Sequence, residues 1–147
     1  MSPSIRPARE SDLGVLLQIE ARRPTAPGWS RQQFESELSS ERSYFVVLEQ
    51  NGLVCGYAGF WKVPPEAQVT TLVVAPEVGG KGLGRNLLLH LLEVCRALEY
   101  EKVTLEVSSR NDPAMKLYLS AGFEVVGRRA KFYNDGSDAV LMDLRLS

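Results

Sequence analysis

A glycine-rich run with two basic residues lies directly before a stretch of helical periodicity. Lys81 and Arg85 add two full positive charges to a segment in which four of six successive positions are glycine. These are Gly79, Gly80, Gly82 and Gly84. Glycines before a helix let backbone N–H groups turn toward an anion, and the helix N-terminus adds partial positive charge. The run therefore predicts a diphosphate site between Gly80 and Arg85, with a flexible turn that merely leads into the helix as the alternative.

Two common phosphate-binding motifs do not fit this run. A P-loop needs GxxxxGK followed by Ser or Thr, and that pattern is absent from the sequence. In a dinucleotide fingerprint, Gly80 and Gly82 could supply the first two glycines, but Arg85 stands at the third position. That motif also follows the first strand of a parallel sheet, whereas several antiparallel strands are expected before this run. Both alternatives are therefore excluded.

Composition limits the class of protein. The chain has 147 residues, of which 44% are hydrophobic and 24% charged, with a formal net charge of -1. These values predict a single globular domain over residues 1–147, without direct binding of nucleic acid or membrane. No apolar stretch approaches a membrane span of about 20 residues. Residues 1–7 lack the apolar core of a signal peptide, so we expect a cytoplasmic protein, either a monomer or a homodimer.

The cysteines and the histidine suggest structural roles. Cys55 and Cys95 form no CxxC pair and are predicted to be reduced, buried thiols. His90, the one histidine, lies among leucines with no adjacent cysteine or aspartate cluster. A zinc site needs several such ligands, so we expect no metal.

The periodicity predicts an α/β fold with a mixed (α+β) sheet and helices on both of its faces. The element order is β-α-α-β-β-β-α-β-α-β-β. The expected strands are Ile5–Arg6, Tyr44–Glu49, Leu53–Val63, Gln68–Val74, Lys102–Val107, Phe123–Ala130 and Ala139–Leu146. The expected helices cover Ser11–Ala21, a segment from Ser30, a long segment after the glycine run, and a segment from Asn111 to Ala121.

Local signals support these boundaries. Ser30 and Gln33 match a capping box, Asn51-Gly52 matches a hairpin turn, and Gly122 suits the left-handed position after a helix. Two helical stripes are expected to face the core. The first consists of Leu13, Leu16, Leu17 and Glu20, and the second of Leu83, Leu87, Leu91, Val94 and Leu98.

Two motifs resemble those of a known superfamily. Leu72–Pro76, continued by Gly82–Arg85, resembles the acetyl-coenzyme A motif of the GCN5-related N-acetyltransferases (GNAT). Asn111, Tyr118 and Ala121-Gly122-Phe123 resemble the second conserved block of that superfamily, and the likeness covers nearly the whole chain. Short segments resemble in particular the ribosomal-protein N-terminal alanine acetyltransferases, the RimI type. They are Trp29-Ser30, Glu66-Ala67, Leu105-Glu106-Val107 and Tyr133 to Ala139.

The resemblance implies a GNAT acyl-CoA N-acyltransferase fold and acetyl-CoA as acetyl donor, with roles for individual residues. Leu72, Val73 and Val74 would offer strand backbone to the pantetheine arm and the acetyl carbonyl, and Asn111 would contact the cofactor. The diphosphate would be held by Gly80, Lys81, Gly82, Leu83, Gly84 and Arg85. At Gly79 the chain departs from its relatives, which usually have Gln or Arg there, so one side-chain contact to phosphate is missing.

Glu106 and Tyr118 match the general base and the general acid of the family. From the residues alone, Glu106 is a solvated glutamate on the strand face opposite Leu105 and Val107. Tyr118 lies on an apolar helix stripe, where a core tyrosine is the simpler interpretation. The resemblance favours the catalytic roles, in which Glu106 removes a proton from the amine, directly or through one water, and Tyr118 protonates the departing thiolate.

The acceptor is expected to be a protein or peptide N-terminus. An α-amino group has a pKa of about 8 and is already partly neutral, whereas a lysine amine near 10.4 is almost fully protonated. In relatives of this type, loops that carry aromatic residues flank the acceptor groove, and Trp29, Phe132 and Tyr133 lie in such loops here. Asp135 and Asp138 could attract a basic peptide or serve their own turn. A small-molecule amine or lysine acceptor, and a module that binds acyl-CoA without catalysis, are the alternatives.

Overall fold

The computed structural model describes residues 3–23, 28–78 and 82–146, and its element order is the predicted one. The strands are β1 (Ser4–Pro7), β2 (Ser43–Gln50), β3 (Leu53–Val63), β4 (Glu66–Val74), β5 (Lys102–Ser108), β6 (Glu124–Arg129) and β7 (Ala139–Arg145). The helices are α1 (Leu13–Ala21), α2 (Arg31–Ser39), α3 (Leu83–Ala97) and α4 (Asp112–Ser120). Short 3₁₀ turns cover Glu10–Asp12 and Pro76–Val78. The first of these occupies part of the helix that was predicted to begin at Ser11.

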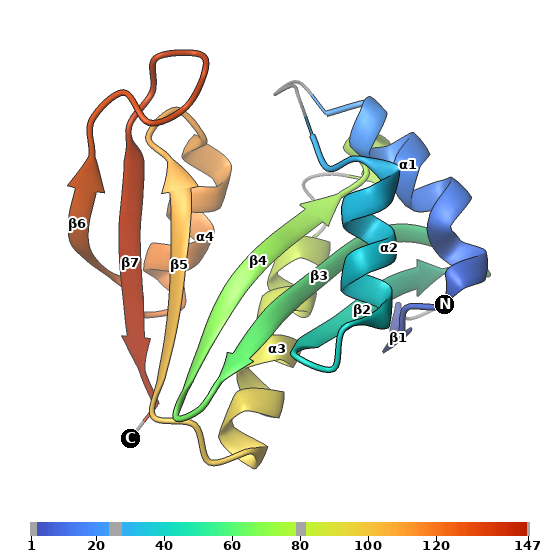
Figure 1. Cartoon of the computed structure of the whole chain (residues 1–147), viewed down its shortest axis with the longest axis horizontal. Helices are drawn as coiled ribbons and strands as arrows, with labels where there is room; N and C mark the ends of the chain where they lie inside the picture. The colour runs from blue at the N-terminus through green and yellow to red at the C-terminus, as the bar shows by residue number, and fades with distance from the viewer. Residues whose placement is uncertain (1–2, 24–27, 79–81, 147) are drawn as a thin grey trace. The chain divides into compact units, whose positions relative to one another are not determined.

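The seven strands pair in the order β1-β2-β3-β4-β5-β7-β6 (Figure 1). Antiparallel ladders join β1 to β2, β2 to β3, β5 to β7 and β6 to β7. A parallel ladder joins Glu66–Gln68 of β4 to Lys102–Thr104 of β5. Parallel neighbours need a crossover connection, and α3 supplies it. The predicted mixed sheet is therefore confirmed.

Contacts divide the chain into two compact units. Unit 1 comprises residues 1–62 and 70–91, and unit 2 comprises residues 63–69 and 92–147. Strand β4 and helix α3 each begin in one unit and end in the other. The single domain over residues 1–147 stays a prediction.

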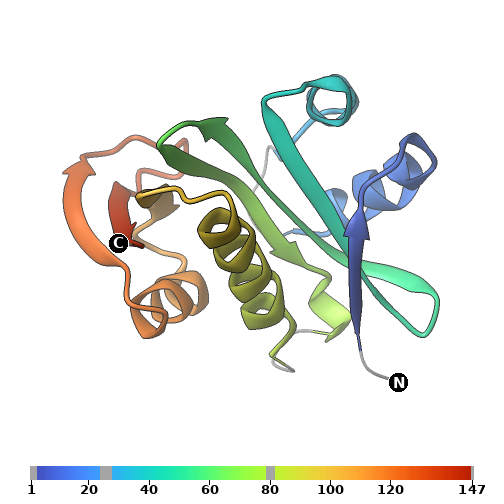
Figure 2. The same cartoon turned by 90° about the horizontal axis from the view of Figure 1, so that it is seen from below.

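In unit 1, helices lie on both faces of the strands. Helices α1 and α2 cover one face, and the first part of α3 lies against the other (Figures 1 and 2). Leu16, Ile19 and Phe34 from the first two helices are fully buried, as are Leu87 and Leu88 from α3. Burial of this many large apolar side chains is the main stabilising term for the unit.

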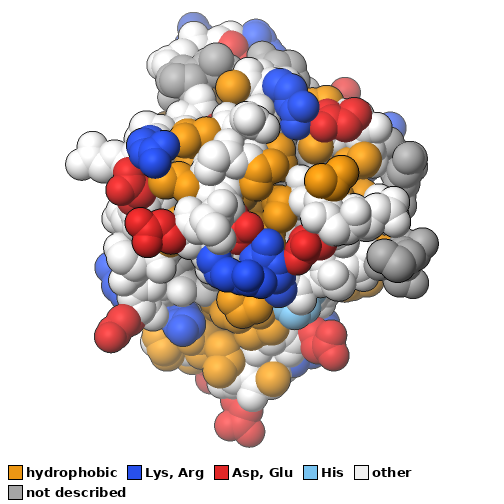
Figure 3. All heavy atoms as spheres, turned by 90° about the vertical axis from the view of Figure 1, so that its right-hand side faces the viewer, with side chains coloured by type: hydrophobic (Ala, Val, Ile, Leu, Met, Phe, Trp, Pro, Cys, Tyr) orange, Lys and Arg blue, Asp and Glu red, His pale blue; other side chains and the backbone are white. Residues whose placement is uncertain are grey.

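Acidic and basic side chains lie beside one another in unit 1. Arg6 of β1 forms ion pairs with Asp12 and with Glu49. The face drawn in Figure 3 likewise shows basic and acidic side chains beside one another, among neutral and apolar ones. This interspersion agrees with the net charge of -1.

In unit 2, α4 lies on one face of the β5, β7 and β6 strands (Figures 1 and 2). Val103, Leu105 and Val107 of β5 are buried, and Ala139, Val140 and Met142 of β7 are buried beside them. Glu106, which lies between Leu105 and Val107, is exposed on the opposite face. The alternation predicted for this strand is confirmed.

The end of α3 differs from the prediction. Leu98 was expected on the buried stripe, but it is 47% exposed because the helix ends at Ala97. Glu99 adopts a left-handed conformation (φ 61°), and the Tyr100 N–H donates to the Cys95 carbonyl at 3.0 Å. This is the hydrogen-bond pattern of a Schellman cap, and it turns the Tyr100 side chain into the core in place of Leu98.

The cysteines and the histidine have the structural roles expected of them. Cys55 and Cys95 are free and buried. The His90 ring stacks on Tyr44, whose hydroxyl lies 2.8 Å from Nε2 of the histidine. Within the described residues, no cluster of three His, Cys, Asp or Glu side chains could hold a metal ion, and no helix is long and apolar enough to cross a membrane.

The cap of α2 generates a stability prediction. The Ser30 hydroxyl accepts from the Gln33 N–H at 3.2 Å, and the Gln33 side chain accepts from the Ser30 N–H at 2.7 Å. Ser30→Ala should lower the free energy of unfolding by about 1 kcal/mol, because it leaves a helix N–H without its partner. Urea unfolding followed by circular dichroism measures this loss.

Ser36→Ala is the matched control, because Ser36 is exposed in the interior of the same helix. Alanine has the higher helix propensity, so this variant should be as stable as the unaltered protein or slightly more so. Equal unfolding midpoints for the two variants would contradict the assigned cap.

Candidate active site

The end of β4 supplies the part of the site that was predicted to hold the pantetheine arm. Val73 is buried, whereas Leu72 and Val74 are half-buried. These residues lie beyond Gln68, the last β4 residue of the ladder with β5. On the β3 side the packing is tight: a Cβ on Gly56 would lie 3.0 Å from the Val73 carbonyl oxygen. Glycine at this position therefore lets β3 pass close to the end of β4.

The start of α3 fits the predicted anion-binding geometry where the structure describes it. Gly82 has φ +77°, a conformation that favours glycine, and nothing lies within 4 Å of the place a Cβ would occupy. Its carbonyl accepts from the Asn86 N–H at 3.1 Å, so the helix proper begins at Leu83. The first N–H groups of any helix have no carbonyl one turn back, and those of Leu83 and Gly84 stand at this end. Gly80 and Lys81, and the departing Gly79, lie outside the described residues.

Glu106 lies in unit 2 with two neighbours from the β6–β7 region. The Arg129 Nη2 atom is 3.5 Å from the Glu106 Oε1 atom. The pKa of Tyr133 is raised, first by burial of its phenol and then by the negative charges of Glu106 and Asp135. The structure thus brings the predicted base and the predicted substrate-binding tyrosine into electrostatic range of each other.

Tyr118, the predicted acid, is 7% exposed on α4. Its ring packs edge-on against Phe123, with the centroids 5.7 Å apart. This burial agrees with the core tyrosine that periodicity alone indicated. Its role as proton donor stays a prediction.

Asn111 caps α4, as its position before Pro113 indicated. The Oδ1 atom accepts from the Ala114 N–H at 3.3 Å. The Nδ2 donor and the second lone pair of the oxygen remain available for the predicted contact to the cofactor. That contact stays a prediction.

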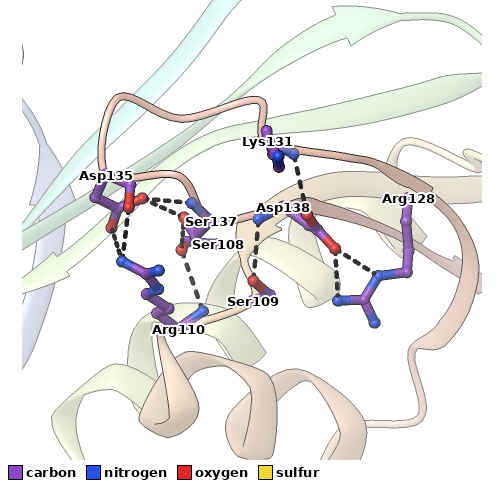
Figure 4. Close-up of polar contacts among 8 residues, drawn as sticks. All are labelled: Ser108, Ser109, Arg110, Arg128, Lys131, Asp135, Ser137 and Asp138. Atoms are coloured by element: carbon purple, nitrogen blue, oxygen red, sulfur yellow. Dashed lines mark hydrogen bonds and ion pairs between the residues drawn. The ribbon is translucent and has the colours of Figure 1, made fainter.

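A polar network fastens the β6–β7 connection to the segment after β5 (Figure 4). The Asp138 carboxylate accepts from the Arg128 guanidinium at 3.0 Å and from the Lys131 N–H at 3.0 Å. The Asp138 N–H donates to the Ser109 hydroxyl at 3.1 Å, and its carbonyl accepts from the Ser109 N–H at 2.9 Å. This part of the network joins the two ends of the connection and attaches them to the chain just after Glu106.

The second half of the network is built on Asp135. Its carboxylate accepts from the N–H and the hydroxyl of Ser137, which hold the pKa of Asp135 below its usual value. The Ser137 hydroxyl also lies 2.7 Å from that of Ser108, and Arg110 donates to the Asp135 carbonyl at 2.7 Å. Asp135 and Asp138 therefore serve their own turn, which was one of the two roles the sequence left open.

Ser108, Ser109 and Arg110 were not singled out from the sequence as residues of the site. The signal was their position, since they come directly after Val107 in the strand that carries Glu106. Phe132 and Tyr133 lie between Lys131 and Asp135, which the network holds. Tyr133 is half-buried and Phe132 is half-exposed, with ring centroids 5.2 Å apart.

Trp29, the other predicted substrate-binding residue, belongs to unit 1. Its ring contacts those of Phe34 and Phe45, with centroids 5.2 Å and 6.1 Å away. Its backbone N–H donates to the Glu20 carboxylate at 3.0 Å. The groove that Trp29 and Tyr133 were expected to flank stays a prediction.

Comparison with known proteins decides the family. The model of the acetyltransferase (GNAT) family matches residues 13–123. The chain belongs to the GNAT acetyltransferase family. This membership confirms the predicted fold and the predicted class of enzyme, an acetyltransferase with acetyl-CoA as donor.

Individual relatives of this GNAT chain extend over most of its length. The ribosomal protein bS18-alanine N-acetyltransferase of Escherichia coli is 35% identical over 140 residues, which cover 93% of each chain. The N-alpha-acetyltransferase RimI of Mycobacterium tuberculosis is 40% identical over 119 residues, which cover 78% of this chain and 73% of the relative.

Solved structures agree with the sequence comparisons. The crystal structure of the Escherichia coli ribosomal-protein-S18-alanine N-acetyltransferase matches with a TM-score of 0.92 and 34% identity, covering 99% of this chain and 95% of that one. The structure of yncA from Salmonella typhimurium with its cofactor acetyl-CoA matches with a TM-score of 0.84 and 25% identity, covering 100% and 95%. The predicted resemblance to the RimI type is thereby confirmed.

The Asp138 network generates a prediction of pH dependence. The Lys131 N–H and then the Arg128 guanidinium lower the pKa of Asp138 in the folded state. A lowered pKa contributes stability that is present above the unfolded value of about 3.9 and is lost as the pH falls through the folded value. The Lys131 amide should therefore lose protection against hydrogen exchange when the solution is acidified through this range.

Asp138→Asn should produce a similar loss of protection already at neutral pH, because a neutral amide oxygen accepts the Lys131 N–H more weakly than a carboxylate does. Hydrogen exchange read by mass spectrometry on peptides that contain Lys131 measures both effects. Asp112→Asn, at an exposed carboxylate in the same unit, is the control and should leave this peptide unchanged. Unchanged exchange in Asp138→Asn would show that the network does not hold the connection.

Proposed function

We propose that this chain transfers the acetyl group of acetyl-CoA to the N-terminal α-amino group of a protein, with an N-terminal alanine of a ribosomal protein as acceptor. The observation that carries the proposal is the end-to-end similarity to the Escherichia coli enzyme, whose name gives bS18 alanine as its acceptor. A ribosomal-protein acceptor would place the reaction in the cytoplasm. A monomer or a homodimer remains the expected assembly.

The donor would bind along β4 and the start of α3. The half-buried Leu72 and Val74 would present strand backbone to the pantetheine arm, since they lie beyond the ladder with β5. The open Gly82 lets a phosphate approach the backbone, and the first N–H groups of α3 point toward it. Gly80, Lys81 and Arg85 complete the predicted diphosphate site.

The chemistry would proceed by direct attack in a ternary complex. Glu106 takes a proton from the incoming ammonium group, directly or through one water, and the neutral nitrogen attacks the thioester carbonyl. As the carbon–sulfur bond breaks, Tyr118 gives its phenolic proton to the leaving thiolate, and the second proton that the nitrogen must lose passes to the resulting phenolate, directly or through water. The exposure of Glu106 on the face away from the core is what makes it reachable by an amine.

The basicity of the acceptor favours an N-terminus over a lysine. An α-amino group with a pKa of about 8 is partly neutral near pH 7.5, whereas less than about 1% of a lysine amine near 10.4 is neutral there. A single carboxylate base therefore has less work to do on an N-terminal amine. The half-buried aromatic side chains of Trp29 and Tyr133 also suit a peptide acceptor, because they offer it apolar contact area.

Competition between acceptors tests the proposal. The purified protein is incubated with acetyl-CoA and three acceptors in equimolar amounts. The first is a peptide with a free N-terminal alanine, the second is a version of it with a blocked N-terminus and an internal lysine, and the third is spermidine. Mass spectrometry should find acetyl groups chiefly on the free α-amino group. Faster acetylation of spermidine or lysine would replace the proposal with the small-amine or lysine alternative.

Replacement of the proposed base tests catalysis itself. Glu106→Gln keeps the size of the side chain but cannot accept the proton, so kcat should fall by about 100-fold or more. The affinity for acetyl-CoA, measured by calorimetry, should stay unchanged because no donor contact is proposed for Glu106. Glu124→Gln, at an exposed strand glutamate of the same unit, is the control and should keep full turnover. Full turnover in Glu106→Gln would instead support a role without this base.

A further inference from the structure

A carboxylate is buried near the C-terminal end of α1. Glu20 is 6% exposed and lies on the same helix face as the fully buried Leu16 and Ile19. The negative end of a helix dipole disfavours an acidic side chain, and a buried charge is costly unless it is paired. An apolar residue would continue the core stripe at lower cost. The hydrogen-bond partners of this carboxylate must therefore offset the cost of burying it.

Three donors from three different segments converge on Glu20. The Tyr57 hydroxyl, from β3, donates to Oε1. Arg23, just after α1, and the backbone N–H of Trp29 donate to Oε2 at 2.9 Å and 3.0 Å. Burial, and then the hydrogen bond to Glu20, raise the pKa of Tyr57, so its phenol keeps the proton that it donates. The two oxygens of one carboxylate thus accept from all three donors.

The backbone before α2 passes directly over this carboxylate. A Cβ on Gly28 would lie 1.8 Å from the Glu20 Oε2 atom. The glutamate side chain cannot move aside without breaking the hydrogen bonds to Tyr57, Arg23 and Trp29. Gly28 is therefore required for the close approach that brings the Trp29 N–H to Glu20.

Aromatic rings hold the side chain of Trp29. The Trp29 ring contacts Phe34 and Phe45. Both of these rings contact Tyr57, with centroids 5.6 Å and 6.1 Å away. Tyr57 in turn donates to Glu20. The backbone of Trp29 is held by the carboxylate while its indole is held by the rings, so the loss of either should displace it.

We infer that Glu20 is a positioning residue for the acceptor: its carboxylate fixes the Gly28–Trp29 backbone and thereby sets where the Trp29 indole stands to meet the incoming peptide. The link to the acceptor rests on the proposed function, in which Trp29 contacts the substrate. The placement of Trp29 by Glu20 does not depend on it.

Fluorescence tests the placement without any substrate. The chain has two tryptophans, Trp29 and Trp61, so Trp61→Phe leaves Trp29 as the sole indole reporter. In that background, Glu20→Leu fills the space with an apolar side chain of similar size and removes both acceptor oxygens. We expect the Trp29 emission to shift to longer wavelength and its quenching by acrylamide to increase. Unchanged emission and quenching would overturn the inference.

Steady-state kinetics tests the consequence for the acceptor. Glu20→Leu should raise KM for an N-terminal alanine peptide about tenfold, which corresponds to the loss of the one charge-assisted hydrogen bond that holds the Trp29 backbone. The KM for acetyl-CoA and kcat should change by less than about twofold, because this residue touches neither the donor nor the reacting atoms. Glu20→Gln keeps an oxygen for the Trp29 N–H and should restore most of the peptide KM. An unchanged peptide KM in Glu20→Leu would overturn the acceptor role.

Two further variants separate positioning from stability. Asp12→Asn replaces the other buried carboxylate described in unit 1, which pairs with Arg6. This variant should lower the stability of the protein but leave the peptide KM unchanged. Gly28→Ala should raise the peptide KM in the unaltered protein but not in Glu20→Ala, where the space for a methyl group is open. Equal effects of Gly28→Ala in both backgrounds would contradict the close approach. If the protein acetylates some other amine and no peptide, the proposed function fails, and the same comparison of KM values is then made with that amine.

Discussion

The single apolar face of β5 is the constraint on which the chemistry of unit 2 depends. Val103, Leu105 and Val107 must point into the core, and the period of a strand then sends Glu106 to the opposite face. The ladders with β4 and β7 hold this register on both sides. A shift of one residue would bury the glutamate and expose three apolar side chains, so the position of the proposed base follows from the stability of the core.

The end of the same strand also positions the neighbouring loop and helix. Ser108 and Ser109 hold the β6–β7 connection, which carries Tyr133, and Asn111 caps the helix that carries Tyr118. The proposed base, the proposed acid and one predicted substrate contact thus all trace back to one short stretch of chain. This arrangement explains how loops without regular structure can present their side chains reproducibly.

Two carboxylates, in different surroundings, hold the segments that carry Trp29 and Tyr133. Glu20 is buried beneath Trp29, where its hydrogen bonds are little screened by solvent and the loss of one partner is expensive. Asp138 lies nearer the surface, where an ion pair such as that with Arg128 is worth little by itself. Several hydrogen bonds share the task at Asp138, whereas the Trp29 backbone depends on one carboxylate. We therefore expect a single substitution to displace the Trp29 segment more easily than the Tyr133 segment.

Much of the fold could be predicted because its signals are local. The capping box at Ser30 and Gln33, the cap at Asn111 and the left-handed Gly122 all appear as expected. Asn51 and Gly52 both have positive φ, as the hairpin turn requires. Each of these features involves residues within a few positions of one another, so the residue types alone carry the information. The expected burial of Leu98 was one exception, because the left-handed turn at Glu99 gives the buried position to Tyr100.

By itself, the sequence determined the order of the elements, the outward face of Glu106, the glycine run before α3 and the motifs of the GNAT family. These depend on spacing along the chain, which is written in the residues. Only the tertiary structure decided that Glu20, seen in the sequence as part of an apolar stripe, is paired with Tyr57 and Trp29, and that Asp135 and Asp138 serve their own turn. Those partners include residues up to 37 positions apart, and their meeting depends on the path of the whole chain, which spacing along the sequence does not encode.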